Sequence, residues 1–114
     1  MKQVLFKNPD IQREFTQLDK RLYPIINYMS EYAWVLHEEF LVVTRIFEKD
    51  DSTHSNPKPY RFIDLAILEA GLEPSEILKN KVNDKFPYGV KGYSTIPTLQ
   101  HGTGPHFHVQ VRPL

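Results

Sequence analysis

A chain of 114 residues is long enough for one hydrophobic core but not for two, so we expect a single domain spanning residues 1–114. The 14 basic and 14 acidic residues give a formal net charge of zero, which argues against nucleic-acid binding, because domains that neutralise phosphates usually carry a basic excess. The absence of cysteine excludes disulfides, thiolate nucleophiles and cysteine-ligated zinc, so any transition metal must be held by histidine and carboxylate.

The first residues contain no long apolar core and no small-residue cleavage site, so we expect no signal peptide and synthesis in the cytoplasm. No run approaches the roughly 18 apolar residues of a membrane span. We therefore expect no membrane insertion.

Two helices are predicted in the N-terminal part, residues 1–37. Asn8 is a suitable N-cap and Pro9 a suitable first helical residue, and Pro24 should end or kink this helix. Its apolar residues recur at helical spacing: Ile11, Phe15, Leu18 and Leu22. A second helix is predicted to start at Pro24, with the apolar set Ile25, Ile26, Met29, Ala33 and Leu36.

Strands dominate the prediction for the remaining part, residues 38–114. Strong strand signals cover 40–47 and 60–68, and the first of these reads as a central strand. A short helix is predicted from Pro74 to about Lys85, followed by a turn at 86–89. The extended stretch 93–99 should lie near a sheet edge, because Pro97 cannot donate a ladder hydrogen bond.

The end of the chain carries three of the five histidines: His101, His106 and His108. His106 and His108 alternate with apolar residues, as expected of a β-strand, so both should project from one face of a sheet. A core gains little from two neighbouring groups that each need a hydrogen-bond partner, so this pattern indicates a metal site.

Further candidate ligands lie in the middle of the chain. Asp64 sits inside an apolar run, where a carboxylate is costly unless it is paired, hydrogen-bonded or bound to a metal. His54 lies in the preceding polar loop. A catalytic zinc site takes three histidine or carboxylate ligands and keeps one position for water, and these segments can supply that set.

These residues resemble a known zinc peptidase superfamily. Ser52-Thr53-His54, then Asp64, then His106-Phe107-His108 are similar to its Ser-x-His, Asp and His-x-His motifs, and the resemblance runs from about residue 40 to 111. The superfamily includes D-alanyl-D-alanine carboxypeptidases, phage endolysins, murein endopeptidases and the hedgehog signalling domain. The ending of this chain looks most like the phage and prophage members.

The resemblance implies one zinc ion per chain, ligated by His54, Asp64 and His108. It implies that His106 lies beside the metal as a base or transition-state stabiliser and that His101 assists it. The implied substrate is a peptidoglycan peptide containing D-amino acids, cleaved by metal-activated water. A protein of this kind would reach the cell wall by lysis or with a virion.

Three candidate substrate-binding residues are Arg45, Ser52 and Tyr88. Arg45 can instead balance a buried carboxylate, and Tyr88 can instead pack within its turn. The expected fold is α+β, with N-terminal helices packed on a small, mainly antiparallel β-sheet that carries the zinc site.

The chain departs from the family pattern in ways that keep a second interpretation open. Ten residues separate His54 from Asp64 where the family usually has seven, and no glutamate follows Glu76, although many peptidase branches carry one before the last zinc histidine. The alternative is a zinc-binding but catalytically inactive structural or binding module, such as a virion component. A cupin-like metal oxygenase also uses His-x-His, but it expects more strands and a later carboxylate.

Overall fold

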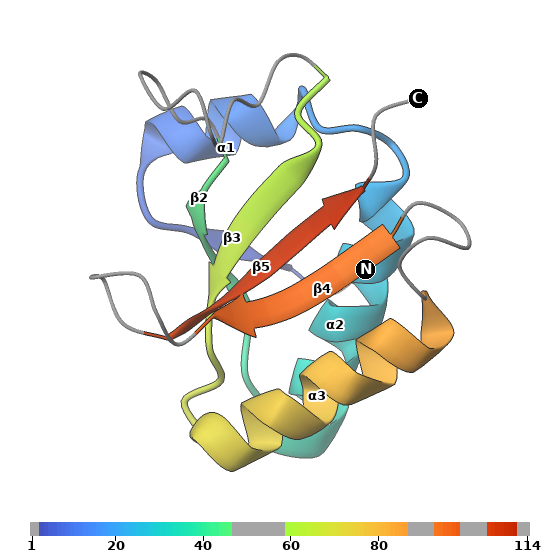
Figure 1. Ribbon diagram of the computed structural model, residues 1–114. Helices are drawn as coiled ribbons and strands as arrows, with labels where there is room; N and C mark the ends of the chain where they lie inside the picture. The colour runs from blue at the N-terminus through green and yellow to red at the C-terminus, as the bar shows by residue number, and fades with distance from the viewer. Residues whose placement is uncertain (1–2, 47–58, 87–92, 99–104, 112–114) are drawn as a thin grey trace.

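The computed structural model describes residues 3–46, 59–86, 93–98 and 105–111. Three helices and five strands follow one another in the order β1 (Leu5–Phe6), α1 (Pro9–Phe15), α2 (Leu22–His37), β2 (Val42–Arg45), β3 (Phe62–Ala66), α3 (Leu72–Lys85), β4 (Tyr93–Thr98) and β5 (His106–Val111). The strands form one sheet in the order β1-β2-β3-β5-β4 (Figure 1). Only the β1–β2 pair is parallel among these strands, which confirms the predicted α+β fold with a mainly antiparallel sheet.

Helix α1 begins as predicted, because the Ile11 N–H donates to the Asn8 side chain at 3.0 Å. The predicted continuation to Leu22 is wrong, since the helix ends at Phe15. The chain that follows pairs instead with the approach to β3: the Asp19 N–H donates to the Tyr60 carbonyl at 2.8 Å. Residues 17–19 thus form backbone hydrogen bonds with Tyr60 instead of continuing the helix.

Helix α2 begins at Leu22, two residues earlier than predicted. Pro24 lies in its first turn, where a missing N–H breaks no intrahelical hydrogen bond. Leu36 was predicted on the apolar face but is 57% exposed. The rest of that face is fully buried: Leu22, Ile25, Ile26, Met29 and Ala33.

The strands are shorter than the sequence suggested, and one was not predicted. β2 and β3 occupy the middle of the predicted stretches 40–47 and 60–68, whereas β1 is a two-residue strand in the part expected to be helical. β4 lies at the edge of the sheet, as its proline predicted. α3 begins at Leu72, two residues before the predicted start, and most of the predicted turn at 86–89 lies outside the described residues.

One hydrophobic core joins the two parts of the chain. Helices α2 and α3 contact each other and lie on the same side of the sheet (Figure 1). Helix α2 also contacts β5, and α3 contacts β4. The sheet side chains in this core are fully buried: Val43, Ile63, Leu65, Phe107, Val109 and Val111. No described helix is both long enough and apolar enough to cross a bilayer.

Candidate functional site

Strand β5 divides its side chains between the core and the opposite face of the sheet. Phe107, Val109 and Val111 are fully buried, whereas His106, His108 and Gln110 are intermediate in exposure. This alternation confirms the predicted strand and places both histidines on one face, because side chains two residues apart share a side.

Strand β3 places a carboxylate next to these histidines. In the antiparallel β3–β5 pair, Asp64 lies opposite His108, and Ala66 lies opposite His106. The Asp64 carboxylate makes a 2.8 Å contact from Oδ1 to Nδ1 of His108, and its Oδ2 lies 3.8 Å from Nε2 of His106. The three side chains are 11–18% exposed. The buried carboxylate therefore has an imidazole partner, as its position in an apolar run required.

The second ring nitrogen of His108 is also engaged. Nε2 lies 2.7 Å from Oε1 of Gln110, two residues further along β5. The ring of Phe62, which pairs with Gln110 across the strands, lies 5.1 Å from the imidazole between centroids at a tilt of 35°. Neither Gln110 nor Phe62 was singled out in the sequence, although the same two-residue alternation assigns both to the face of the histidines.

These contacts change the charge preference of His108. Burial of the imidazole lowers its pKa, but the hydrogen bonds to Asp64 and Gln110 and the negative charge of Asp64 act in the opposite direction. The balance raises the pKa of His108 above the usual value of 6.5. The two oxygen acceptors therefore favour the protonated form of His108 more than water does.

Arg45 extends this row of residues to a third strand. It is the Cα partner of Asp64 in the β2–β3 pair, after an irregularity in register between Val43 and Arg45. The side chain of Arg45 is exposed. The sheet thus brings the predicted substrate-binding arginine level with Asp64 and His108, a position that suits both substrate binding and charge balance.

The other predicted site residues lie outside the described residues: Ser52, His54, Tyr88 and His101. Within the described ranges, no group of three or more histidine, aspartate or glutamate side chains is placed to hold a metal ion. Of the three predicted ligands, the structure thus describes two, Asp64 and His108, and brings them into direct contact.

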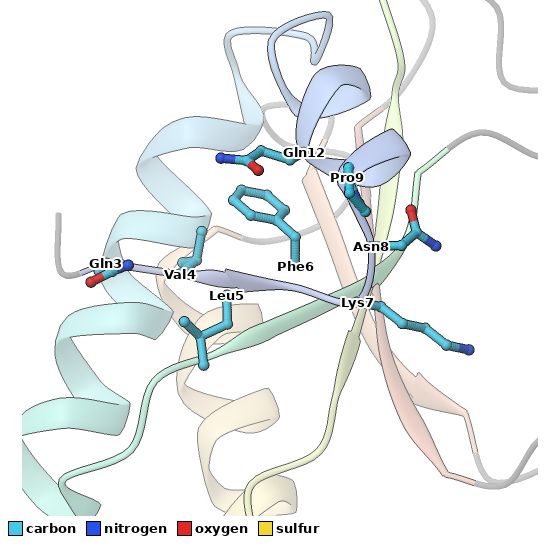
Figure 2. A pocket seen from close by; sticks show the side chains of 8 residues that line it. All are labelled: Gln3, Val4, Leu5, Phe6, Lys7, Asn8, Pro9 and Gln12. Atoms are coloured by element: carbon cyan, nitrogen blue, oxygen red, sulfur yellow. The ribbon is translucent and has the colours of Figure 1, made fainter.

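A pocket lies elsewhere, along β1 and the start of α1 (Figure 2). Phe6 and Gln12 border it from one side of the strand, while Leu5 points the other way. Its lining comes from one short segment and contains no histidine or carboxylate: Gln3, Val4, Leu5, Phe6, Lys7, Asn8, Pro9 and Gln12. Metal-assisted hydrolysis needs such groups as ligands and as a base, so we assign the candidate site to the face of β3 and β5.

No family model, curated protein or solved structure matches this chain. The resemblance to the zinc peptidase superfamily thus stays a prediction carried by the motifs themselves.

Proposed function

We propose that this protein is a zinc-dependent peptidase that hydrolyses amide bonds in the D-amino-acid-containing peptides of peptidoglycan. The observation that carries the proposal is the contact between Asp64 and His108. These residues are 44 positions apart in sequence, the resemblance implies that both are zinc ligands, and their donor atoms lie 2.8 Å apart on adjacent strands.

The donor set fits zinc. A carboxylate and an imidazole are both ligands that Zn²⁺ takes in catalytic sites, and Asp64 and His108 offer one of each from rigid strands. His54 is the third ligand that the motif supplies. Zinc, when bound, lowers the pKa of a coordinated water toward about 7 and polarises the carbonyl of the scissile bond.

His106 is the proposed general base. Its imidazole lies on the same face as Asp64 and His108, 3.8 Å from the Asp64 carboxylate, and its side chain is 14% exposed. An imidazole in this position can accept a proton from water and deliver it to the leaving amine. His101 is proposed to assist it, and Arg45, Ser52 and Tyr88 to bind the peptide, with the Arg45 guanidinium suited to a substrate carboxylate.

The first test is the metal content of the purified protein, supplied with zinc at neutral pH. Wild type is expected to hold about one zinc per chain, because three protein ligands form a complete zinc site. His54→Ala and Asp64→Asn are expected to lose it. His37→Ala is the matched control, because His37 ends α2 and contacts the Tyr32 ring rather than the site.

Digestion of purified peptidoglycan then separates the two candidate functions. Release of peptide fragments by wild type, and not by His54→Ala, supports the peptidase. Stoichiometric zinc without any release supports the inactive binding module, for which the absence of glutamate after Glu76 is the favouring observation. A wild-type protein without stoichiometric zinc contradicts both.

A further inference from the structure

Both ring nitrogens of His108 face oxygen atoms in a four-residue cluster, which we define as Phe62, Asp64, His108 and Gln110. Nδ1 lies 2.8 Å from the Asp64 carboxylate and Nε2 lies 2.7 Å from the Gln110 amide oxygen. We propose that Gln110 is a positioning residue that holds the Nε2–H of His108 and so reserves Nδ1 for a metal shared with Asp64. This inference rests on the proposed function.

The strand register builds the cluster as two adjacent rungs. Asp64 pairs with His108 and Phe62 pairs with Gln110, so the four residues occupy one face at consecutive same-face positions of β3 and β5. This arrangement depends only on two strands of the core-bearing sheet. It is therefore fixed by the fold rather than by a loop.

Three neighbours restrict the imidazole. Asp64 and Gln110 contact its two nitrogens, and the Phe62 ring, 7% exposed, lies tilted against it. Rotation of the ring would break both nitrogen contacts at once. The orientation of His108 is thus set before any metal arrives.

The amide of Gln110 decides which nitrogen carries the proton of a neutral imidazole. A neutral ring has one N–H, and its other nitrogen is the one able to bind a metal. The Asp64 carboxylate alone would draw the proton to Nδ1, the nitrogen that faces it. An acceptor at Nε2 opposes this preference, and metal-bound histidines generally donate their second N–H to such a partner.

The sequence offers this residue no role in the zinc motif. Gln110 lies outside His106-Phe107-His108, and its function follows from its contact with the second nitrogen of the last histidine. The chemistry it supplies is an uncharged hydrogen-bond acceptor, which keeps the site's net charge unchanged.

The test compares zinc affinity, by competition with a chelator, in wild type, Gln110→Ala and Gln110→Glu. Loss of an outer acceptor of this kind typically lowers metal affinity about 10–100-fold, so Gln110→Ala should fall in that range. Gln110→Glu should restore most of it, because its carboxylate accepts the same Nε2–H. Gln12→Ala is the control, since Gln12 is exposed on α1 and should bind zinc like wild type.

A second measurement locates the proton on the His108 ring. Nitrogen NMR of zinc-loaded protein with labelled histidine should show His108 with its proton on Nε2, protected from exchange in wild type and exchanging faster in Gln110→Ala. A purely structural glutamine would move the thermal midpoint of unfolding without moving this signal. If Gln110→Ala also lowers the thermal midpoint, the zinc affinity of Gln110→Glu separates the two explanations. An affinity near that of wild type supports the proposal, and a loss as large as that of Gln110→Ala overturns it.

The possible failures are distinguishable. Equal zinc affinity in wild type and Gln110→Ala, or a His108 proton on Nδ1 in the loaded protein, overturns the role of Gln110 while wild-type zinc binding leaves the proposed function standing. A wild type that binds no zinc overturns the proposed function, and the role of Gln110 with it.

Discussion

The two faces of strands β3 and β5 are built from alternating residues of the same eleven positions, yet they differ in chemistry. The core face is apolar and fully buried, from Ile63 and Leu65 on β3 to Phe107 and Val109 on β5. The opposite face holds a carboxylate, two imidazoles and an amide. Because the side-chain period of a strand is two, one backbone can serve packing on one side and polar chemistry on the other.

The buried carboxylates offer a second contrast. Asp19 accepts three hydrogen bonds from the backbone and guanidinium of Arg21, at 2.8–3.0 Å. The side-chain hydrogen bond from Arg21 is the main cause that lowers the pKa of Asp19. Asp64, by contrast, is partnered by imidazoles, which can exchange a proton for a metal. The arginine-bound Asp19 is therefore suited to stabilising the fold, whereas Asp64, beside the histidines, is suited to binding a metal.

The largest expected effect comes from the core face. Phe107→Ala should lower the free energy of unfolding by about 3–5 kcal/mol, because it leaves a cavity at a fully buried position. Phe107→Leu, which keeps more of the volume, should cost about 1 kcal/mol. Urea unfolding followed by circular dichroism measures both. A small effect of Phe107→Ala on the free energy of unfolding would show that the core face does not dominate stability.

On the opposite face, His106→Ala should change activity rather than stability. Loss of a general base lowers the hydrolysis rate by about 10²–10⁴-fold, while zinc content should stay at about one per chain, because His106 is not a proposed ligand. Peptide release from peptidoglycan and metal analysis of the same sample measure the two properties. Full activity in this variant would remove His106 from the mechanism.

The same substitution to asparagine should affect stability at one buried carboxylate and zinc binding at the other. Asp19→Asn should cost about 1–2 kcal/mol of stability and leave zinc content unchanged, because it weakens charge-assisted hydrogen bonds to Arg21. Asp64→Asn should lose zinc. The lowered pKa of Asp19 implies that its contribution is present above about pH 3.8 and is lost as the pH falls through the pKa of the folded protein.

The exposed pair between Asp10 and Arg13 is the control for the Asp19 comparison. Both its side chains are more than 70% exposed, so Asp10→Asn should leave the urea midpoint unchanged within error. An equal effect of the two substitutions would mean that burial does not distinguish these ion pairs.

The smallest expected effect is the pH dependence of the metal-free protein. The raised pKa of His108 means that the folded state holds the proton more tightly than the unfolded state. Its stabilisation is present below about pH 6.5 and is lost as the pH rises through the pKa of the folded protein. The urea midpoint of wild type should therefore fall over this range relative to His108→Gln. With zinc bound the sign should reverse, because metal binding requires neutral imidazole.

The elements that were predicted correctly are those with a local sequence signal. The alternation in 106–111, the N-cap at Asn8 and the proline in the edge strand all have local physical causes, and the structure confirms each. The predicted continuation of α1 failed because Leu18 and Asp19 pair with the chain at Tyr60, a contact distant in sequence. β1 was missed because two residues carry no periodicity.

The candidate site divides in the same way. The pattern of residue types predicted a metal site at Asp64, His106 and His108, whereas the assignment of ligands and base came from the resemblance of their motifs. Gln110 and Phe62 were missed, because a glutamine and a phenylalanine on a strand carry no chemical signal until a partner is known. Their contacts with His108 depend on how β3 aligns with β5.

The sequence by itself determined which side chains share a face, because the alternation of a strand is a property of its own backbone. It also determined that a buried carboxylate needs a partner, because desolvating an unpaired charge is costly. Only the tertiary structure decided that the partner of Asp64 is His108, and that Gln110 holds the other nitrogen of the same ring. Register between strands distant in the chain is set by the packing of the whole core, and that register creates the contacts.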